Sequence, residues 1–133
     1  MISGIGTDLI AIERIARVWQ RHGERLCAHI LSPEERIEFT GVHDPARWLA
    51  KRWAAKEAFA KAAGTGMRGP LKWAAITIVH DALGRPGIAL APFLQAWLHR
   101  RGIDASHLSI SDERDMACAV VVLECKETRN VVA

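Results

Sequence analysis

The stretch that decides the fold is Trp53-Ala54-Ala55-Lys56-Glu57-Ala58-Phe59-Ala60-Lys61, which is rich in strong helix formers. Asp44 and Pro45 precede it as an N-cap residue and a first-turn proline. Gly64 follows it, and glycine is the residue that most often ends a helix. We therefore predict one long helix that opens at Asp44 and ends near Gly64.

One face of this predicted helix carries an acid and a base beside a large aromatic side chain. Trp53, Glu57 and Lys61 recur at intervals of four, and the alanines around them allow close approach by a ligand or another element. An exposed ion pair between Glu57 and Lys61, which stabilises a helix by only about 0.2–0.5 kcal/mol, is the alternative interpretation. Their alignment with Trp53 favours a binding site.

A second acidic residue stands near the N terminus, in Gly4-Ile5-Gly6-Thr7-Asp8. Residues 2–9 predict a short strand, in which glycines let backbone approach backbone or ligand closely. Taken alone, Asp8 suits the N-cap of the helix predicted over 10–20. Taken together, Asp8 and Glu57 with nearby lysines predict a magnesium-diphosphate site, because Mg²⁺ takes one or two carboxylates and completes its shell with water and phosphate oxygens.

Length and composition exclude several classes of protein. Half of the 133 residues are hydrophobic and a quarter are charged, which is typical of one folded domain; we predict a domain over 1–125 and a tail over 126–133. No apolar run reaches the roughly 18 residues of a membrane span, and no signal-peptide pattern is present, so we expect a cytoplasmic protein without a membrane partner. The three cysteines lack metal-ligand spacing and are interpreted as reduced and structural. The glycine turn over 64–66 does not open a helix and lacks P-loop spacing, which excludes a P-loop nucleotidase.

The remaining chain passes from helices to strands. Ser32-Pro33 predicts a further helix start, and later segments predict a hairpin over 73–80 and 87–90, a helix over 93–101, and strands over 107–111 and 116–123. Helices early and strands late favour an α+β fold over a parallel doubly wound sheet.

Arginines form a stripe on the helix predicted over 10–20. Arg14, Arg17 and Arg21, with Arg25 if the helix survives Gly23, lie within an arc of about 80°. Such a stripe fits a solvated face, a nucleic-acid footprint or a dock for an acidic protein helix. Four neighbouring like charges repel one another, which argues against a merely solvated face.

The two stretches that contain Asp8 and Glu57 resemble the signature motifs of the 4′-phosphopantetheinyl transferases. The short single-domain layout is similar to the holo-acyl-carrier-protein synthases of that superfamily, and the likeness spans nearly the whole chain, including Gly84-Arg85-Pro86 and the segment 109–124. The resemblance implies that family's fold, with helices packed on a mostly antiparallel sheet. It also implies Mg²⁺-dependent transfer of the 4′-phosphopantetheine group from coenzyme A to a serine of apo acyl carrier protein, with release of 3′,5′-ADP.

The resemblance further implies roles for individual residues. Asp8, Glu57 and Lys61 would be catalytic, with Asp8 and Glu57 holding Mg²⁺. Arg14 and Arg21 would face the acidic recognition helix of acyl carrier protein. The residues implied to contact coenzyme A are Arg52, Lys56, Lys61, Gly64, Thr65, Gly66 and Pro86. A homotrimer with active sites between subunits is implied as well, and five tryptophans with a valine-rich terminal strand are an apolar load that oligomerisation would bury.

Alternatives stay open at three points. Many relatives carry a histidine directly after Ser-x-Ser, where this chain has Asp112; Asp112 either contacts a water of the metal shell or caps a turn, and the turn is favoured. The general base is Glu57, a metal-bound water or a carboxylate of the carrier protein. A small basic nucleic-acid-binding module is the alternative function, but it leaves Asp8 and Glu57 unexplained, so we expect no nucleic-acid partner.

Overall fold

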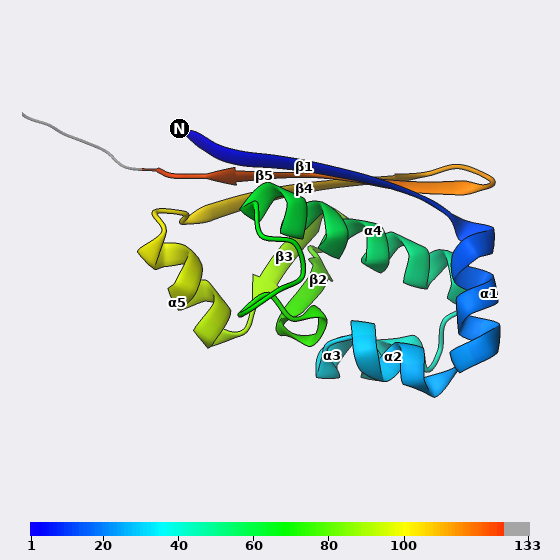
Figure 1. The fold of residues 1–133 in the computed structure, drawn as a ribbon. Helices are drawn as coiled ribbons and strands as arrows, with labels where there is room; N and C mark the ends of the chain where they lie inside the picture. The colour runs from blue at the N-terminus through cyan, green and yellow to red at the C-terminus, as the bar shows by residue number, and fades with distance from the viewer. Residues whose placement is uncertain (127–133) are drawn as a thin grey trace, which may run out of the picture.

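Helices cover one side of a three-stranded antiparallel sheet (Figure 1). The computed structural model describes residues 1–126. In chain order the elements are β1 (Ile2–Ala11), α1 (Ile12–His22), α2 (Glu24–Ile30), α3 (Pro33–Phe39), α4 (Pro45–Ala63), a 3-10 turn η1 (Trp73–Ala75), β2 (Ile76–His80), β3 (Pro86–Leu90), α5 (Pro92–Arg100), β4 (Ala105–Asp112) and β5 (Met116–Glu124). The predicted α+β class is confirmed.

The larger sheet has the strand order β1-β5-β4, and β2 and β3 form a separate antiparallel hairpin beside β4. Alternate residues of β5, from Ala117 to Leu123, are buried against the helices. Asp8 pairs with one of them, Ala119, and directly paired residues of an antiparallel sheet point to the same face. The carboxylate of Asp8 therefore points toward the helical layer.

The central helix α4 begins and ends where the sequence predicts. The Asp44 side chain accepts a hydrogen bond from the backbone N–H of Arg47, and Pro45 occupies the first turn. Gly64 closes the helix in the left-handed conformation, at φ +81°, and its N–H donates to the carbonyl of Ala60. This helix lies along β1 and β5 (Figure 1).

Two glycines let α4 lie directly on the backbone of β1. A Cβ atom at Gly4 would collide with the carbonyl oxygen of Ala62, and one at Gly6 would collide with that of Ala58. The predicted close approach of backbone to backbone is thereby confirmed. It fixes the distance between the strand that carries Asp8 and the helix that carries Glu57.

The arginine stripe does not extend past Gly23, the condition on which Arg25 would have joined it. Helix α1 ends at His22 because Gly23 adopts a φ of +50°, a left-handed value that favours glycine, and α2 starts at Glu24. Arg25 therefore belongs to α2, where its guanidinium donates to His22 Nδ1 at 3.2 Å. The stripe on α1 consists of Arg14, Arg17 and Arg21.

Three smaller expectations concern the membrane, the cysteines and the C terminus. Across residues 1–126, no helix is both long enough and apolar enough to cross a bilayer. Cys27, Cys118 and Cys125 are free, and burial raises the pKa of the Cys27 thiol, which disfavours the reactive thiolate. Apart from Lys126, the predicted tail over 126–133 lies outside the described residues.

Candidate active site

Lys61 and Asp8 meet at the contact between α4 and β1. Lys61 Nζ donates to Asp8 Oδ1 at 3.1 Å and to the carbonyl oxygen of Thr7 at 2.9 Å. The Asp8 side chain is only 16% exposed, so this amino group is its nearest counter-charge. Asp8 does not cap the following helix, because the N-cap of α1 is Ala11 and receives no side-chain hydrogen bond.

Glu57 completes a group of charges that we call the acidic site: Asp8, Glu57, Lys61 and Arg14. Partial burial raises the pKa of the Glu57 carboxyl, and the negative charge of Asp8 raises it further, whereas Lys61 and Arg14 act in the opposite direction. Within the described chain Lys61 forms its ion pair with Asp8 and not with Glu57. The alternative interpretation, a helical ion pair between Glu57 and Lys61, is thus not what the structure shows: Lys61 contacts a residue of another element.

The donor set of the acidic site fits Mg²⁺. Two carboxylates repel each other there, and a cation between them would relieve this repulsion. Residues 1–126 contain no cluster of three or more His, Cys, Asp or Glu side chains arranged to hold a metal. Mg²⁺ retains waters and takes substrate phosphate oxygens, so two protein carboxylates are enough to hold it. Zn²⁺ and Ca²⁺ take more protein ligands and therefore fit this site less well.

Lys56, predicted to contact coenzyme A, lies on another face of α4 and points into the protein interior. Its side chain is fully buried, and Nζ donates to the carbonyl oxygens of Ile30 and Trp73 and to Glu35 Oε1. All three donors of the ammonium group are used in the protein interior. The sequence analysis missed Glu35, although Ser32 and Glu35 have the spacing of a capping box, which the structure contains.

Arg52 is also buried but is poorly paired. The side chain is 5% exposed, its guanidinium carbon lies 3.8 Å from the centroid of the Trp48 ring, and Nη2 is 3.9 Å from Glu38 Oε1. Its Nε atom is buried without a hydrogen-bond partner in the described part of the chain. A buried guanidinium with an unused donor is suited to an anion such as a phosphate.

Arg52, His80 and Pro86 form a second group, which we call the Arg52 group. Burial and, after it, the charge of Arg52 lower the pKa of His80, and Pro86 pairs with His80 across the β2–β3 hairpin. At about 100° per residue, Arg52 and Glu57 lie about 140° apart around α4. A single chain therefore does not bring Arg52 and Pro86 to the acidic site.

The other predicted site residues lie at the two ends of this region. Gly64, Thr65 and Gly66 end α4 one turn after Lys61, and the N–H groups of both glycines donate to the carbonyl of Ala60. Thr65 Oγ1 donates to the carbonyl of Gly66 at 2.9 Å. Arg14 and Arg21 are exposed on α1, two turns apart.

Asp112 has a different role from both predicted ones. As the last residue of β4, it accepts a hydrogen bond from Arg47 Nη1 at 2.8 Å and lies 3.6 Å from Lys51 Nζ. Arg47 also donates to the carbonyls of Glu113 and Arg114. The favoured turn cap at Asp112 is therefore wrong: Arg47 of α4 holds the β4–β5 hairpin, a contact that no local sequence signal predicts.

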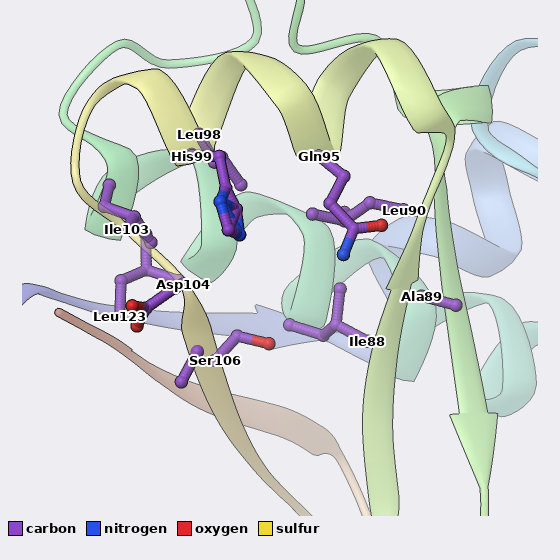
Figure 2. A pocket seen from close by; sticks show the side chains of 11 residues that line it. Ile88, Ala89, Leu90, Gln95, Leu98, His99, Ile103, Asp104, Ser106 and Leu123 are labelled. Atoms are coloured by element: carbon purple, nitrogen blue, oxygen red, sulfur yellow. The ribbon is translucent and has the colours of Figure 1, made fainter. Parts of the chain in front are cut away.

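One enclosed space lies away from both groups. A cavity of about 350 Å³ opens between β3, α5 and β4, with Ile88, Leu98 and Leu123 as apolar walls and His99 and Ser106 among its polar groups (Figure 2). No residue of the acidic site or of the Arg52 group lines this cavity. This cavity is therefore not part of the candidate active site.

Known proteins are similar to this chain in both sequence and fold. Residues 4–121 match the 4′-phosphopantetheinyl transferase superfamily. A holo-[acyl-carrier-protein] synthase of Laribacter hongkongensis is 52% identical over 124 residues, which cover 93% of this chain and 99% of that protein. The crystal structure of holo-[acyl-carrier-protein] synthase from Neisseria meningitidis superposes with a TM-score of 0.91 at 49% identity, covering 93% of this chain and 99% of that one.

A more distant structure carries a ligand. The holo-(acyl-carrier-protein) synthase of Bacillus anthracis, in complex with coenzyme A (3′,5′-ADP), has a TM-score of 0.80 at 32% identity and covers 95% of this chain and 99% of that one. These matches extend over almost the full length of both partners in each comparison. The chain belongs to the 4′-phosphopantetheinyl transferase superfamily, among its holo-[acyl-carrier-protein] synthases.

Proposed function

We propose that the chain transfers the 4′-phosphopantetheine group of coenzyme A to a serine of apo acyl carrier protein at the acidic site. The observation that carries this proposal is the meeting of Asp8 and Glu57, two mutually repelling carboxylates, beside the ammonium group of Lys61. The names of the relatives support the substrate class, and the bound coenzyme of the Bacillus anthracis structure supports the donor.

The proposed reaction is a phosphoryl-type transfer. The serine oxygen attacks the β-phosphorus of coenzyme A while its proton passes to a general base. A new oxygen–phosphorus bond forms, and the bond to the leaving phosphate oxygen breaks to release 3′,5′-ADP. Such transfers depend mainly on positioning and on neutralisation of charge. Asp8 and Glu57 would hold Mg²⁺, which when bound supplies positive charge to the diphosphate. Lys61, which is 54% exposed, is free to turn its ammonium group from Asp8 toward a phosphate oxygen.

The Arg52 group supports a site shared between subunits. We propose a homotrimer in which Arg52 and Pro86 of one subunit complete the coenzyme site at Asp8 and Glu57 of another. The buried, unused Nε donor of Arg52 provides a partner for a coenzyme phosphate. This arrangement explains why one chain keeps the two groups on different faces of α4.

The uncovered face of the large sheet offers a surface for that assembly. In residues 1–126, no element lies over the side of the sheet opposite the helices (Figure 1). Ile5, Leu9 and Val120 point to that side and are 58%, 64% and 37% exposed. An apolar sheet face of this kind is a typical subunit interface.

Calorimetric binding tests the proposed function against the nucleic-acid alternative. We expect coenzyme A to bind only weakly in EDTA and more tightly when Mg²⁺ is added, because the paired carboxylates otherwise repel the diphosphate. Duplex DNA should show no binding that survives physiological salt. Binding to duplex with a steep salt dependence, together with no Mg²⁺-dependent binding of coenzyme A, would instead support the nucleic-acid module.

A further inference from the structure

Glu35 and Lys56 form an ion pair in the interior of the protein. Both side chains are 0% exposed, and Lys56 Nζ lies 2.6 Å from Glu35 Oε1. Neither residue touches the acidic site or has a role in the reaction described above. A buried ion pair of this kind need not stabilise the fold, because well-packed apolar residues often replace such a pair without lowering the free energy of unfolding.

The pair is fully hydrogen-bonded to the surrounding elements. Glu35 Oε1 accepts from the N–H of Ser32 and Oε2 accepts from the N–H of Ile78, each at 2.9 Å. Lys56 Nζ donates in addition to the carbonyl of Ile30 at 2.6 Å and to that of Trp73 at 3.0 Å. The two side chains thus tie α4 to the end of α2, the start of α3, η1 and β2.

These contacts constrain how α4 can rotate and slide. On its other side α4 packs against β1 through Gly4 and Gly6, whose contacts with alanine carbonyls limit distance but have no directional partner. Hydrogen bonds to an ammonium group depend steeply on distance and angle. The Lys56 contacts therefore constrain the rotation of the helix about its axis together with the hydrogen bonds of Arg47 and Lys61, while the glycines limit its height above the strand.

Glu57 is the residue directly after Lys56, about 100° further around the same helix. We infer that the Glu35–Lys56 pair positions Glu57 opposite Asp8 and thereby sets the separation of the two carboxylates. This inference rests on the proposed function of the acidic site. Lys56 and Glu35 are positioning residues: they act on the metal and the diphosphate only through the placement of Glu57.

Replacing both partners tests the inference without leaving a buried charge unpaired. In Glu35→Gln/Lys56→Met the directional contacts of Lys56 disappear while the side-chain volumes are nearly kept. We expect the Mg²⁺ concentration for half-maximal transfer to rise roughly 10- to 100-fold, the range found when groups that orient metal ligands are removed. The Michaelis constant for acyl carrier protein should stay within about twofold of the parent value, because the exposed arginines of α1 proposed to bind the carrier are unchanged.

Leu94→Ala is the matched control, because Leu94 is a fully buried residue of α5 that is not one of the hydrogen-bond partners of Glu35 or Lys56. It should lower the melting temperature and leave the Mg²⁺ requirement unchanged, which separates an effect on the position of Glu57 from a general loss of stability.

Glu35→Asp is a milder second variant that keeps the charge but shortens the side chain, and we expect an intermediate rise in the Mg²⁺ requirement.

Two outcomes distinguish failure of the inference from failure of the proposed function. If Glu57→Gln abolishes transfer but Glu35→Asp and the double variant retain the parental Mg²⁺ requirement, the positioning role is overturned and the acidic site stands. If Glu57→Gln transfers like the parent, the proposed site fails, and the inference fails with it. Should the double variant not fold, the Mg²⁺ requirement of Glu35→Asp decides alone.

Discussion

Lys61 Nζ lies 3.1 Å from Asp8 Oδ1, although the two residues are 53 positions apart in the chain. The contact exists because Gly4 and Gly6 let α4 lie against the backbone of β1. The same packing places Glu57 within electrostatic range of Asp8. The glycines of the first motif therefore belong to the architecture of the site, even though they contribute no reactive group.

Gly6→Ala tests this architecture. The added methyl group would collide with the carbonyl oxygen of Ala58, so we expect overpacking to lower the free energy of unfolding by about 1–3 kcal/mol. The shift of β1 should also weaken Mg²⁺-dependent binding of coenzyme A. Gly41→Ala is the control, because nothing lies within 4 Å of a Cβ atom there. Denaturant unfolding and calorimetry of both variants provide the comparison, and equal stability of the two would contradict the packing argument.

Glu57→Gln should stabilise the metal-free chain while removing its activity. The pKa of Glu57 is raised above 4.5 in the folded chain, so the folded state binds more protons than the unfolded state above that pH. By linkage, the contribution of Glu57 to stability is present below pH 4.5 and is lost as the pH rises through the folded pKa. In EDTA, the melting temperature of Glu57→Gln minus that of the parent should thus increase as the pH rises from 4.5 to 7. If the parent instead became more stable relative to the variant over this interval, the pKa of Glu57 would not be raised in the folded chain.

Arg14 and Arg21 should differ in effect, although both are exposed on α1. Arg21→Ala should raise the Michaelis constant for acyl carrier protein roughly tenfold at low salt, with a smaller effect at high salt and little change for coenzyme A. Arg14→Ala should also weaken Mg²⁺-coenzyme A binding, because the charge of Arg14 lowers the pKa of Glu57. Steady-state kinetics over a salt series separates the two. If both substitutions affect both substrates equally, the division between docking and active-site roles is wrong.

Leu9→Asp tests the proposed assembly. Leu9 is 64% exposed on the uncovered face of the sheet, and a charge there should disrupt an apolar interface. We expect light scattering to show a trimer for the parent and a smaller species for the variant, with loss of transfer. Leu83→Asp, at a 95% exposed position between β2 and β3, should leave mass and activity unchanged. A parent that is monomeric and fully active on dilution would exclude the shared site.

Local signals in the sequence predicted α4 well, because its N-cap, first-turn proline and terminal glycine each act within one turn of the helix. Contacts between elements that are distant in the sequence were harder to predict. Lys56 and Glu57 are neighbours in one motif, yet Lys56 enters the interior, where it pairs with the buried acid Glu35, and Glu57 lies within electrostatic range of Asp8. Periodicity indicates which residues share a face of a helix, but it does not identify the partner of each face.

Two further differences have specific physical causes. Whether Arg25 joins the arginine stripe stayed open because the sequence does not show that Gly23 takes a positive φ and breaks the helix. Asp112 was assigned to a turn because its partner, Arg47, is 65 residues away. Both features depend on conformation or tertiary contacts that have no local pattern.

Intact-mass spectrometry of apo acyl carrier protein tests the central claim most directly. The carrier is incubated with coenzyme A, Mg²⁺ and either the parent chain, Asp8→Asn or Glu57→Gln. The account predicts that the parent adds one phosphopantetheine group to the carrier, that EDTA prevents this, and that both variants leave nearly all of the carrier unmodified while melting as folded proteins. Unmodified carrier with the parent chain, or full modification by either variant, would contradict it.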